Sequence, residues 1–191
     1  MPKLAFRPLT ANEWDDFQEL FGPRGACGGC WCMWWRLPRS QYNAGRGNGN
    51  RRAMKKLVDG GAITGLLAYE GARAVGWCSI AQRGEFIGLE RSRVLARVDD
   101  RPAWSIVCFF VAKDRRHTGV TEKLLEAAVR FARRNGARII EGYPVEPGSG
   151  GTADAFAYTG LASVFRRAGF TEAARRSPRR AVYRKTVRPL S

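Results

Sequence analysis

The 191-residue sequence has a single histidine, His117, and no apolar run that approaches the ~20 residues of a membrane-spanning helix. Its first residues also lack the apolar core of a signal peptide. We therefore expect no membrane segment, and a cytoplasmic protein. Neither an internal repeat nor a change in composition divides the chain, so we predict one domain that covers residues 1–191.

The scarcity of histidine also bears on the cysteines. Cys27, Cys30 and Cys32 form a Cys-x-x-Cys-x-Cys pattern. A structural zinc site usually takes four Cys or His ligands, and no second pair follows at a suitable spacing, so we expect no metal. Cys108 lacks a second histidine that would activate it as a nucleophile, and we expect it to belong to the core. Five cysteines is an odd number, which favours free thiols.

Acidic residues are few, at 17 Asp and Glu against 33 Lys and Arg, which gives a net charge of +16. Residues 36–56 contain no acid, and residues 166–188 contain only Glu172. Clustered positive charge of this kind indicates an anionic partner, either a phosphate-bearing small molecule or RNA. A basic surface that only contacts solvent is the alternative.

The most informative segment covers residues 104–135. Residues 104–111 are mostly apolar, aromatic and β-branched, which predicts a strand buried on both faces. Residues 119–135 carry apolar side chains at helical spacing, at Val120, Leu124, Ala127, Ala128 and Phe131. The basic, glycine-containing turn between them leads into a helix N-terminus, where main-chain N–H groups and the helix dipole favour a phosphate.

The rest of the chain predicts a mixture of helices and strands. Thr10 and Glu13 form a capping box before a helix that Gly22 ends. Strands are expected at residues 4–9, 65–69, 73–81, 138–144, 170–175 and 181–187, and helices at 51–59 and 161–168, with a short one within 82–100. Residues 27–36 are expected to form an aromatic-rich loop. Residues 38–50 and 147–151 are expected to be polar or glycine-rich loops.

Two short segments resemble signatures of one family. Residues 116–121, Arg-His-Thr-Gly-Val-Thr, resemble the Arg/Gln-x-x-Gly-x-Gly/Ala signature of the GNAT superfamily of N-acyltransferases. Residues 165–170, Phe-Arg-Arg-Ala-Gly-Phe, are similar to the family's Tyr-x-x-x-Gly-Phe segment. The order of expected elements also agrees with that family over nearly the whole chain. The sequence is most similar to a bacterial branch with a Cys- and Trp-rich N-terminal segment. It departs from the family pattern at Thr121 and Phe165.

The resemblance implies an α/β (α+β) GNAT fold, with a mixed, mostly antiparallel sheet flanked by helices. A splayed strand pair would surround acetyl-CoA or another acyl-CoA. The pantetheine arm would bond to the main chain of Phe109, Phe110 and Val111. The pyrophosphate would lie on the turn, with added charge from Arg115 and Arg116. Its binding residues would be Arg115, Arg116, His117, Thr118, Gly119, Val120 and Thr121.

The proton donor differs from the family pattern, because Phe165 replaces the tyrosine that protonates the leaving thiolate in many family members. Tyr158 is the best substitute by residue type, and a purely structural tyrosine is the alternative. Glu141, on the strand that borders the reaction gap, is the expected general base. A structural pair between Glu141 and an arginine is the alternative.

The acceptor is expected to contact Trp34, Trp35 and Tyr143. The pocket would be built from residues 31–41 and 82–93. For the two tryptophans, a lid or core contact is the alternative.

Three functions follow from these expectations. The first is transfer of an acyl group to an amine by direct attack in a ternary complex. The second is a GNAT-fold transferase that uses or modifies aminoacyl-tRNA, and the third is a non-catalytic acyl-CoA-binding module. Monomer and homodimer are both compatible with the sequence.

Overall fold

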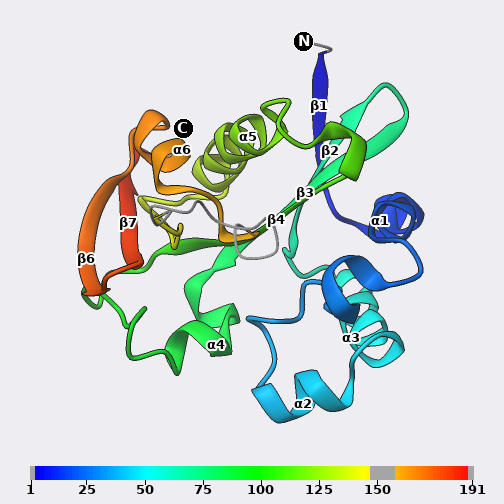
Figure 1. Cartoon of the computed structure of the whole chain (residues 1–191), viewed down its shortest axis with the longest axis horizontal. Coiled ribbons are helices and arrows are strands. Elements are labelled where there is room, and N and C mark those ends of the chain that lie inside the picture. The colour runs from blue at the N-terminus through cyan, green and yellow to red at the C-terminus, as the bar shows by residue number, and fades with distance from the viewer. Residues whose placement is uncertain (1–2, 147–157, 189–191) are drawn as a thin grey trace.

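A computed structural model describes residues 3–146 and 158–188 of the chain, and its centre is a seven-stranded sheet in the order β1-β2-β3-β4-β5-β7-β6 (Figure 1). The strands are β1 (Leu4–Pro8), β2 (Gly65–Glu70), β3 (Arg73–Gln82), β4 (Trp104–Val111), β5 (Ile139–Gly142), β6 (Thr171–Ser177) and β7 (Arg180–Thr186). Only β4 and β5 pair in parallel, and the other neighbours are antiparallel. The expected mixed, mostly antiparallel sheet is confirmed.

The helices cover both faces of this sheet. They are α1 (Trp14–Phe21), α2 (Arg39–Ala44), α3 (Asn48–Asp59), α4 (Ile87–Glu90), α5 (Val120–Arg134) and α6 (Ala162–Arg167). Figure 1 shows α5 and α6 on one side, and α1 to α4 on the other. Successive side chains of β2 point to opposite faces of the sheet and so enter two different hydrophobic clusters. Leu66 and Ala68 pack beneath α5, whereas Leu67 and Tyr69 pack with α1 and α3. Of the helices in the described ranges, none has the length and apolar character that crossing a bilayer would take.

The chain between residues 38 and 50 differs from the expectation. The loop predicted there is wrong, because α2 begins at Arg39 and α3 begins at Asn48. Tyr42 is buried, and the buried Asn50 side chain donates to the carbonyl oxygens of Gly29 and Tyr42, at 3.1 and 3.3 Å. These tertiary contacts stabilise helical structure that the glycines of this stretch disfavour locally. The loop predicted at residues 147–151 lies outside the described residues.

The β4–β5 ladder is short, and its end positions the site. It joins Trp104, Ser105 and Ile106 to Ile140, Glu141 and Gly142, whereas β4 continues to Val111. On the other edge of β4 the register with β3 shifts between Ser79 and Ile80, which pair with Cys108 and Ile106. Val107 is therefore an extra residue, and such a bulge bends a strand. The ladder ends where the family resemblance predicts the two strands to part.

Phe165 of α6 packs where the ladder ends. Its side chain is fully buried, and its ring lies 6.3 Å from the ring of Phe109 and 5.0 Å from that of Phe170, centroid to centroid. The ring lies against Gly142 and Gly160, and a Cβ on either glycine would clash with it. Phe165 therefore serves as an apolar wedge beside the end of β5.

Candidate active site

The turn between β4 and α5 has the geometry of an anion site. After a short 3-10 turn at Lys113–Arg115 the chain is extended at Arg116, and it then takes positive φ at His117 (61°) and Gly119 (82°). The Thr118 hydroxyl donates to the Arg115 carbonyl oxygen at 2.7 Å, which closes the turn. Among the described side chains none caps α5, so the N–H groups of its first turn are available to a ligand.

The structure brings the expected phosphate residues together. Arg116, His117, Thr118, Gly119, Val120 and Thr121 form one turn and the start of α5, directly after the free end of β4 with Phe109, Phe110 and Val111. The Arg116 Nε lies 3.5 Å from the Val111 carbonyl oxygen, so this side chain returns toward the strand. The threonine at position 121 still offers its main-chain N–H within the first turn of α5.

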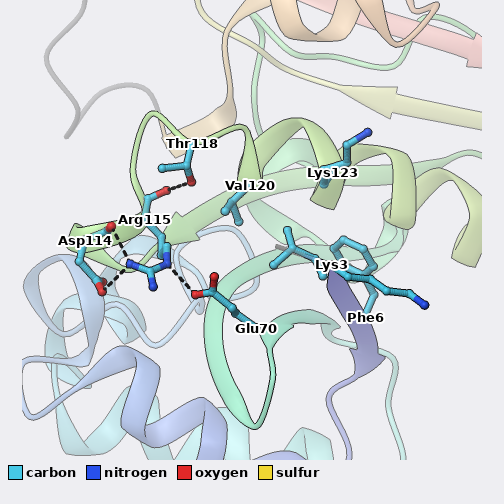
Figure 2. Close-up of a pocket in the computed structure, with 9 residues that line it drawn as sticks. Lys3, Phe6, Glu70, Asp114, Arg115, Thr118, Val120 and Lys123 are labelled. Carbon is cyan, nitrogen blue, oxygen red and sulfur yellow. Dashed lines mark hydrogen bonds and ion pairs between the residues drawn. The ribbon is translucent and has the colours of Figure 1, made fainter. Parts of the chain in front are cut away.

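Arg115 has different surroundings from those expected of a phosphate ligand. Its guanidinium lies 2.7 Å from the Glu70 carboxylate and 3.1 Å from that of Asp114, as Figure 2 shows. Asp114 is also held by Arg73 at 2.8 and 3.1 Å. These ion pairs join the turn to the β2–β3 hairpin, so Arg115 fixes the position of the turn. Beside it lies a cavity of about 470 Å³ whose lining includes Lys3, Thr118 and Lys123.

Glu141 lies at the centre of a buried ionic cluster. Its side chain is 1% exposed, and it lies 2.7 Å from Arg184 of β7 and 3.2 Å from Arg83 at the end of β3. The Tyr143 hydroxyl also donates to it, at 3.0 Å. Both carboxylate oxygens are thus occupied and shielded from an incoming amine. The geometry favours the structural alternative, and a role as general base stays a prediction.

Tyr143 is expected to contact the acceptor. It is fully buried, and its hydroxyl accepts from Arg83 at 2.7 Å and lies 2.7 Å from the Ser105 hydroxyl. Burial and the nearby Glu141 raise the pKa of Tyr143. Its hydrogen bonds belong to the same ionic cluster as Glu141, and a contact with the acceptor stays a prediction.

Tyr158 lies beside Arg180, Trp34 and Cys108 of β4. Burial raises the pKa of its phenol, the Cys108 thiol adds to the rise, and Arg180 and the Trp34 indole oppose it. The hydroxyl therefore stays protonated at neutral pH, as a proton donor requires. The structure places Tyr158, Trp34 and Cys108 close together on the side of β4 away from α5.

The two loops expected to form the acceptor pocket are in contact. The Gly88 N–H donates to the Trp35 carbonyl oxygen at 2.8 Å, and Arg36 lies 3.6 Å from Glu85. Trp34 is partly exposed and stacks beneath Arg39, whose guanidinium carbon is 3.5 Å from the ring centroid. Trp35 is also partly exposed, but it packs against Gly88 and is a wall between the loops.

Two functional arginines were not predicted from the sequence. Arg83 holds Glu141 and Tyr143 from 58 and 60 positions away, and Arg180 lies beside Tyr158. Arg83 directly follows β3 and Arg180 begins β7, so their place at the end of a strand is the only signal that the sequence gives. In so arginine-rich a chain that signal does not single out a residue.

Comparison with known proteins defines the class. The model of the acetyltransferase (GNAT) family matches residues 31–148, more than half of the chain. The chain therefore belongs to the GNAT family, whose members are acyl-CoA-dependent N-acyltransferases. No curated protein matches it by sequence.

Solved structures show the same fold at low identity. A GNAT-family acetyltransferase from Desulfovibrio desulfuricans aligns with TM-score 0.54 and 16% identity, over 96% of this chain and 99% of its own. The PaiA N-acetyltransferase of Thermoplasma acidophilum, in complex with coenzyme A, aligns with TM-score 0.55 and 11% identity, over 97% and 99%. Arabidopsis thaliana NAA60, in complex with acetyl-CoA, aligns with TM-score 0.51 and 13% identity, over 97% and 100%.

Replacement of the buried carboxylate tests its role. We expect Glu141→Gln to lower the free energy of unfolding by about 3–5 kcal/mol, because it removes the buried counter-charge that Arg83 and Arg184 share and leaves them only the partly exposed carboxylates of Glu90 and Asp99. Urea denaturation measures the loss. Glu122→Gln breaks a partly exposed pair with Arg167 and should cost under about 1 kcal/mol. A Glu141→Gln protein of unchanged stability but much reduced turnover would instead make Glu141 the base.

Proposed function

We propose that the protein transfers an acetyl or other acyl group from acyl-CoA to an amine, by direct attack in a ternary complex. The observation that carries the proposal is the free end of β4 beside the turn at Gly119 and the N-terminus of α5. The complexes of the Thermoplasma and Arabidopsis proteins with coenzyme A and acetyl-CoA support this assignment at the level of the fold.

The residues present fit such a co-substrate. Main-chain groups of Phe109, Phe110 and Val111 lie past the last β5 pair, where a pantetheine arm can take the place of a strand. The turn and the first N–H groups of α5 accept a pyrophosphate, with Arg116 adding positive charge. Acyl-CoA supplies the thioester, and the protein supplies the position of both reactants and polarising N–H groups.

The proton transfers assign roles to this chain's side chains. As the amine nitrogen bonds to the carbonyl carbon, the carbon–sulfur bond breaks, the nitrogen loses one proton to water, and the leaving thiolate takes up a proton. Phe165 cannot donate it, and we assign that role to Tyr158, whose phenol is protonated at neutral pH and lies beside Cys108 and Trp34. Trp34 would contact the acceptor on the same side of β4.

The second candidate is action on aminoacyl-tRNA, and one observation favours it. Arg39, Arg46 and Arg52 are exposed on α2, α3 and their connection, and no carboxylate of the described residues lies within 4 Å of them. In the other basic cluster Arg166, Arg167, Arg175 and Arg184 pair with acids, and Arg176 donates to main-chain carbonyl oxygens. Phosphates of RNA would therefore bind the α2–α3 surface, close to Trp34.

Substitution in the turn tests the co-substrate site. We expect Gly119→Val to weaken coenzyme A binding at least about tenfold, because a β-branched residue disfavours the positive φ and alters the turn. Isothermal titration with coenzyme A measures the change. Gly136 also has φ 82° but lies at the other end of α5, so Gly136→Val should strain the fold and leave binding unchanged. Equal affinity for Gly119→Val and the wild type would refute the site.

Removal of one hydroxyl tests the proton donor. We expect Tyr158→Phe to reduce the turnover number about 100-fold with unchanged coenzyme A affinity. Thiol release from acetyl-CoA over a panel of amines and amino acids is the assay. Tyr69→Phe is the control, because Tyr69 lies on β2 and its hydroxyl donates to Asp16 of α1. Full activity of Tyr158→Phe would reject the role. A wild type that binds coenzyme A but never releases thiol would be a binding module.

Salt dependence tests the RNA surface. If tRNA binds, a gel-shift assay should show affinity falling steeply between 50 and about 200 mM salt, as phosphate contacts require. Reversing the charge of Arg39, Arg46 and Arg52 should abolish the shift. The same reversal at Arg166, Arg167 and Arg175 changes the net charge equally and should have the smaller effect. The RNA proposal fails if no shift appears at low salt.

A further inference from the structure

Three cysteines that acyl transfer does not use lie together beside β4. The Cys32 and Cys108 Sγ atoms are 3.7 Å apart, although 76 positions separate them in the sequence. Cys32 is buried, whereas Cys30 is partly exposed and adjoins it. Within the described ranges no group of three or more Cys, His, Asp or Glu side chains is arranged to hold a metal ion.

The local backbone gives these thiols different properties. Gly28 and Gly29 have positive φ, and so do Trp31 and Cys32, at 43° and 55°. In this coiled loop the Cys30 Sγ lies 3.6 Å from the Gly25 carbonyl oxygen, and the neighbouring Cys32 thiol lowers the pKa of Cys30 to about 6 against the opposing effect of burial. Burial raises the pKa of Cys32. One thiolate that reaches solvent thus adjoins a buried, protonated thiol.

We propose that Cys30, Cys32 and Cys108 form an oxidative modification site, at which a hydroperoxide converts the reduced pair Cys32 and Cys108 into a disulfide. Cys30 is the entry point, because it is partly exposed on the loop and its pKa is lowered, whereas Cys32 is buried and Cys108, although partly exposed, is in contact with Cys32. Cys32 forms a disulfide first with Cys30 and then, by thiol–disulfide exchange, with Cys108. The site stands on its own residues and does not depend on the acyl-transfer proposal.

The steps balance. The Cys30 thiolate attacks the peroxide, so that a sulfur–oxygen bond forms, the oxygen–oxygen bond breaks, and the leaving alkoxide takes a proton from water. Cys32 then displaces water from the Cys30 sulfenic acid. Cys108 attacks the Cys32 sulfur and releases the Cys30 thiol. In sum, two thiols and one hydroperoxide give one disulfide, one alcohol and one water.

The disulfide would join the loop that carries Trp34 to the strand that carries the proposed co-substrate edge. Cys108 pairs with Ser79 of β3 and precedes Phe109, and its thiol influences the pKa of Tyr158. Oxidation would therefore fix the position of the Trp34 loop relative to β4. Because the linked positions are far apart in sequence, it would also constrain the unfolded chain strongly.

Peptide mapping after oxidation tests the proposal. Reduced protein is treated with one equivalent of hydrogen peroxide, its remaining thiols are alkylated, and it is cleaved with trypsin. The expected product is the peptide of residues 25–36 joined to that of residues 98–113. The thermal midpoint should rise by several degrees on oxidation. An internal bond between Cys30 and Cys32, a sulfinic acid at Cys30, or an alkylated Cys108 would each overturn the assignment.

Variants separate the roles of the three thiols. Cys30→Ser should slow disulfide formation at least about tenfold while leaving Cys32 and Cys108 able to pair. Cys108→Ser should abolish the cross-link, and the Cys30 thiolate should still react with peroxide. Cys78→Ser is the matched control, because Cys78 is another buried thiol of the sheet, and it should oxidise like the wild type. Cross-linking of Cys30→Ser at the wild-type rate would refute the entry role, and unchanged reduced-state thermal midpoints show that the variants fold.

Discussion

The buried charge of Glu141 is the interaction on which the arrangement of the sheet depends. Through Arg83 and Arg184 it ties the end of β3 to β5 and β7, and the Tyr143 and Ser105 hydroxyls connect it to β4. Burial of so many polar groups is costly unless they are paired, and here both Glu141 oxygens are hydrogen-bonded, while the Arg83 Nε has only the charge of Glu90 at 3.1 Å. Asp99 supplies Arg184 with a second carboxylate, at 2.6 Å.

This cluster lies directly beneath the point where β4 and β5 separate. Glu141 pairs with Ser105, and the last pair of the ladder follows it immediately. Up to Ile106, hydrogen bonds and ion pairs hold β4 and β5 together. After Ile106 the two strands separate, at the bulge of Val107 and beside the ring of Phe165. The free edge of β4 is thus fixed on one side by charge and on the other by apolar packing. A co-substrate that binds there meets a rigid edge, which favours positioning as the source of catalysis.

Local pattern was sufficient to predict the central strand, turn and helix, because their signals lie within one continuous stretch. The apolar run predicted β4 with its correct ends, and the helical period predicted four of the buried positions of α5. The capping box of Thr10 and Glu13 is also confirmed. By contrast, α2 depends on the burial of Tyr42 and on Asn50 bonds to distant carbonyl oxygens, which local propensity does not contain. The glycines between residues 38 and 50 predicted a loop because glycine has a low helix propensity.

The site was less predictable because its partners are distant in the sequence. Arg83 and Arg184 hold Glu141 in the ionic cluster, and Arg83 also bonds Tyr143. The order of residues in and after β5 does not indicate these partners. Glu70 lies 45 positions from Arg115, and the ion pair between them could not be read from the basic turn that contains this arginine. Long-range pairing, and not residue type, therefore separates the residues that hold the fold from those that can meet a ligand.

Native mass spectrometry of the purified protein tests the central claim most directly. If the turn at Gly119 and the free edge of β4 form an acyl-CoA site, each chain should carry or take up one coenzyme A, with a corresponding increase in mass. A protein that keeps its own mass in the presence of saturating acetyl-CoA, or that binds only nucleic acid, would contradict the account.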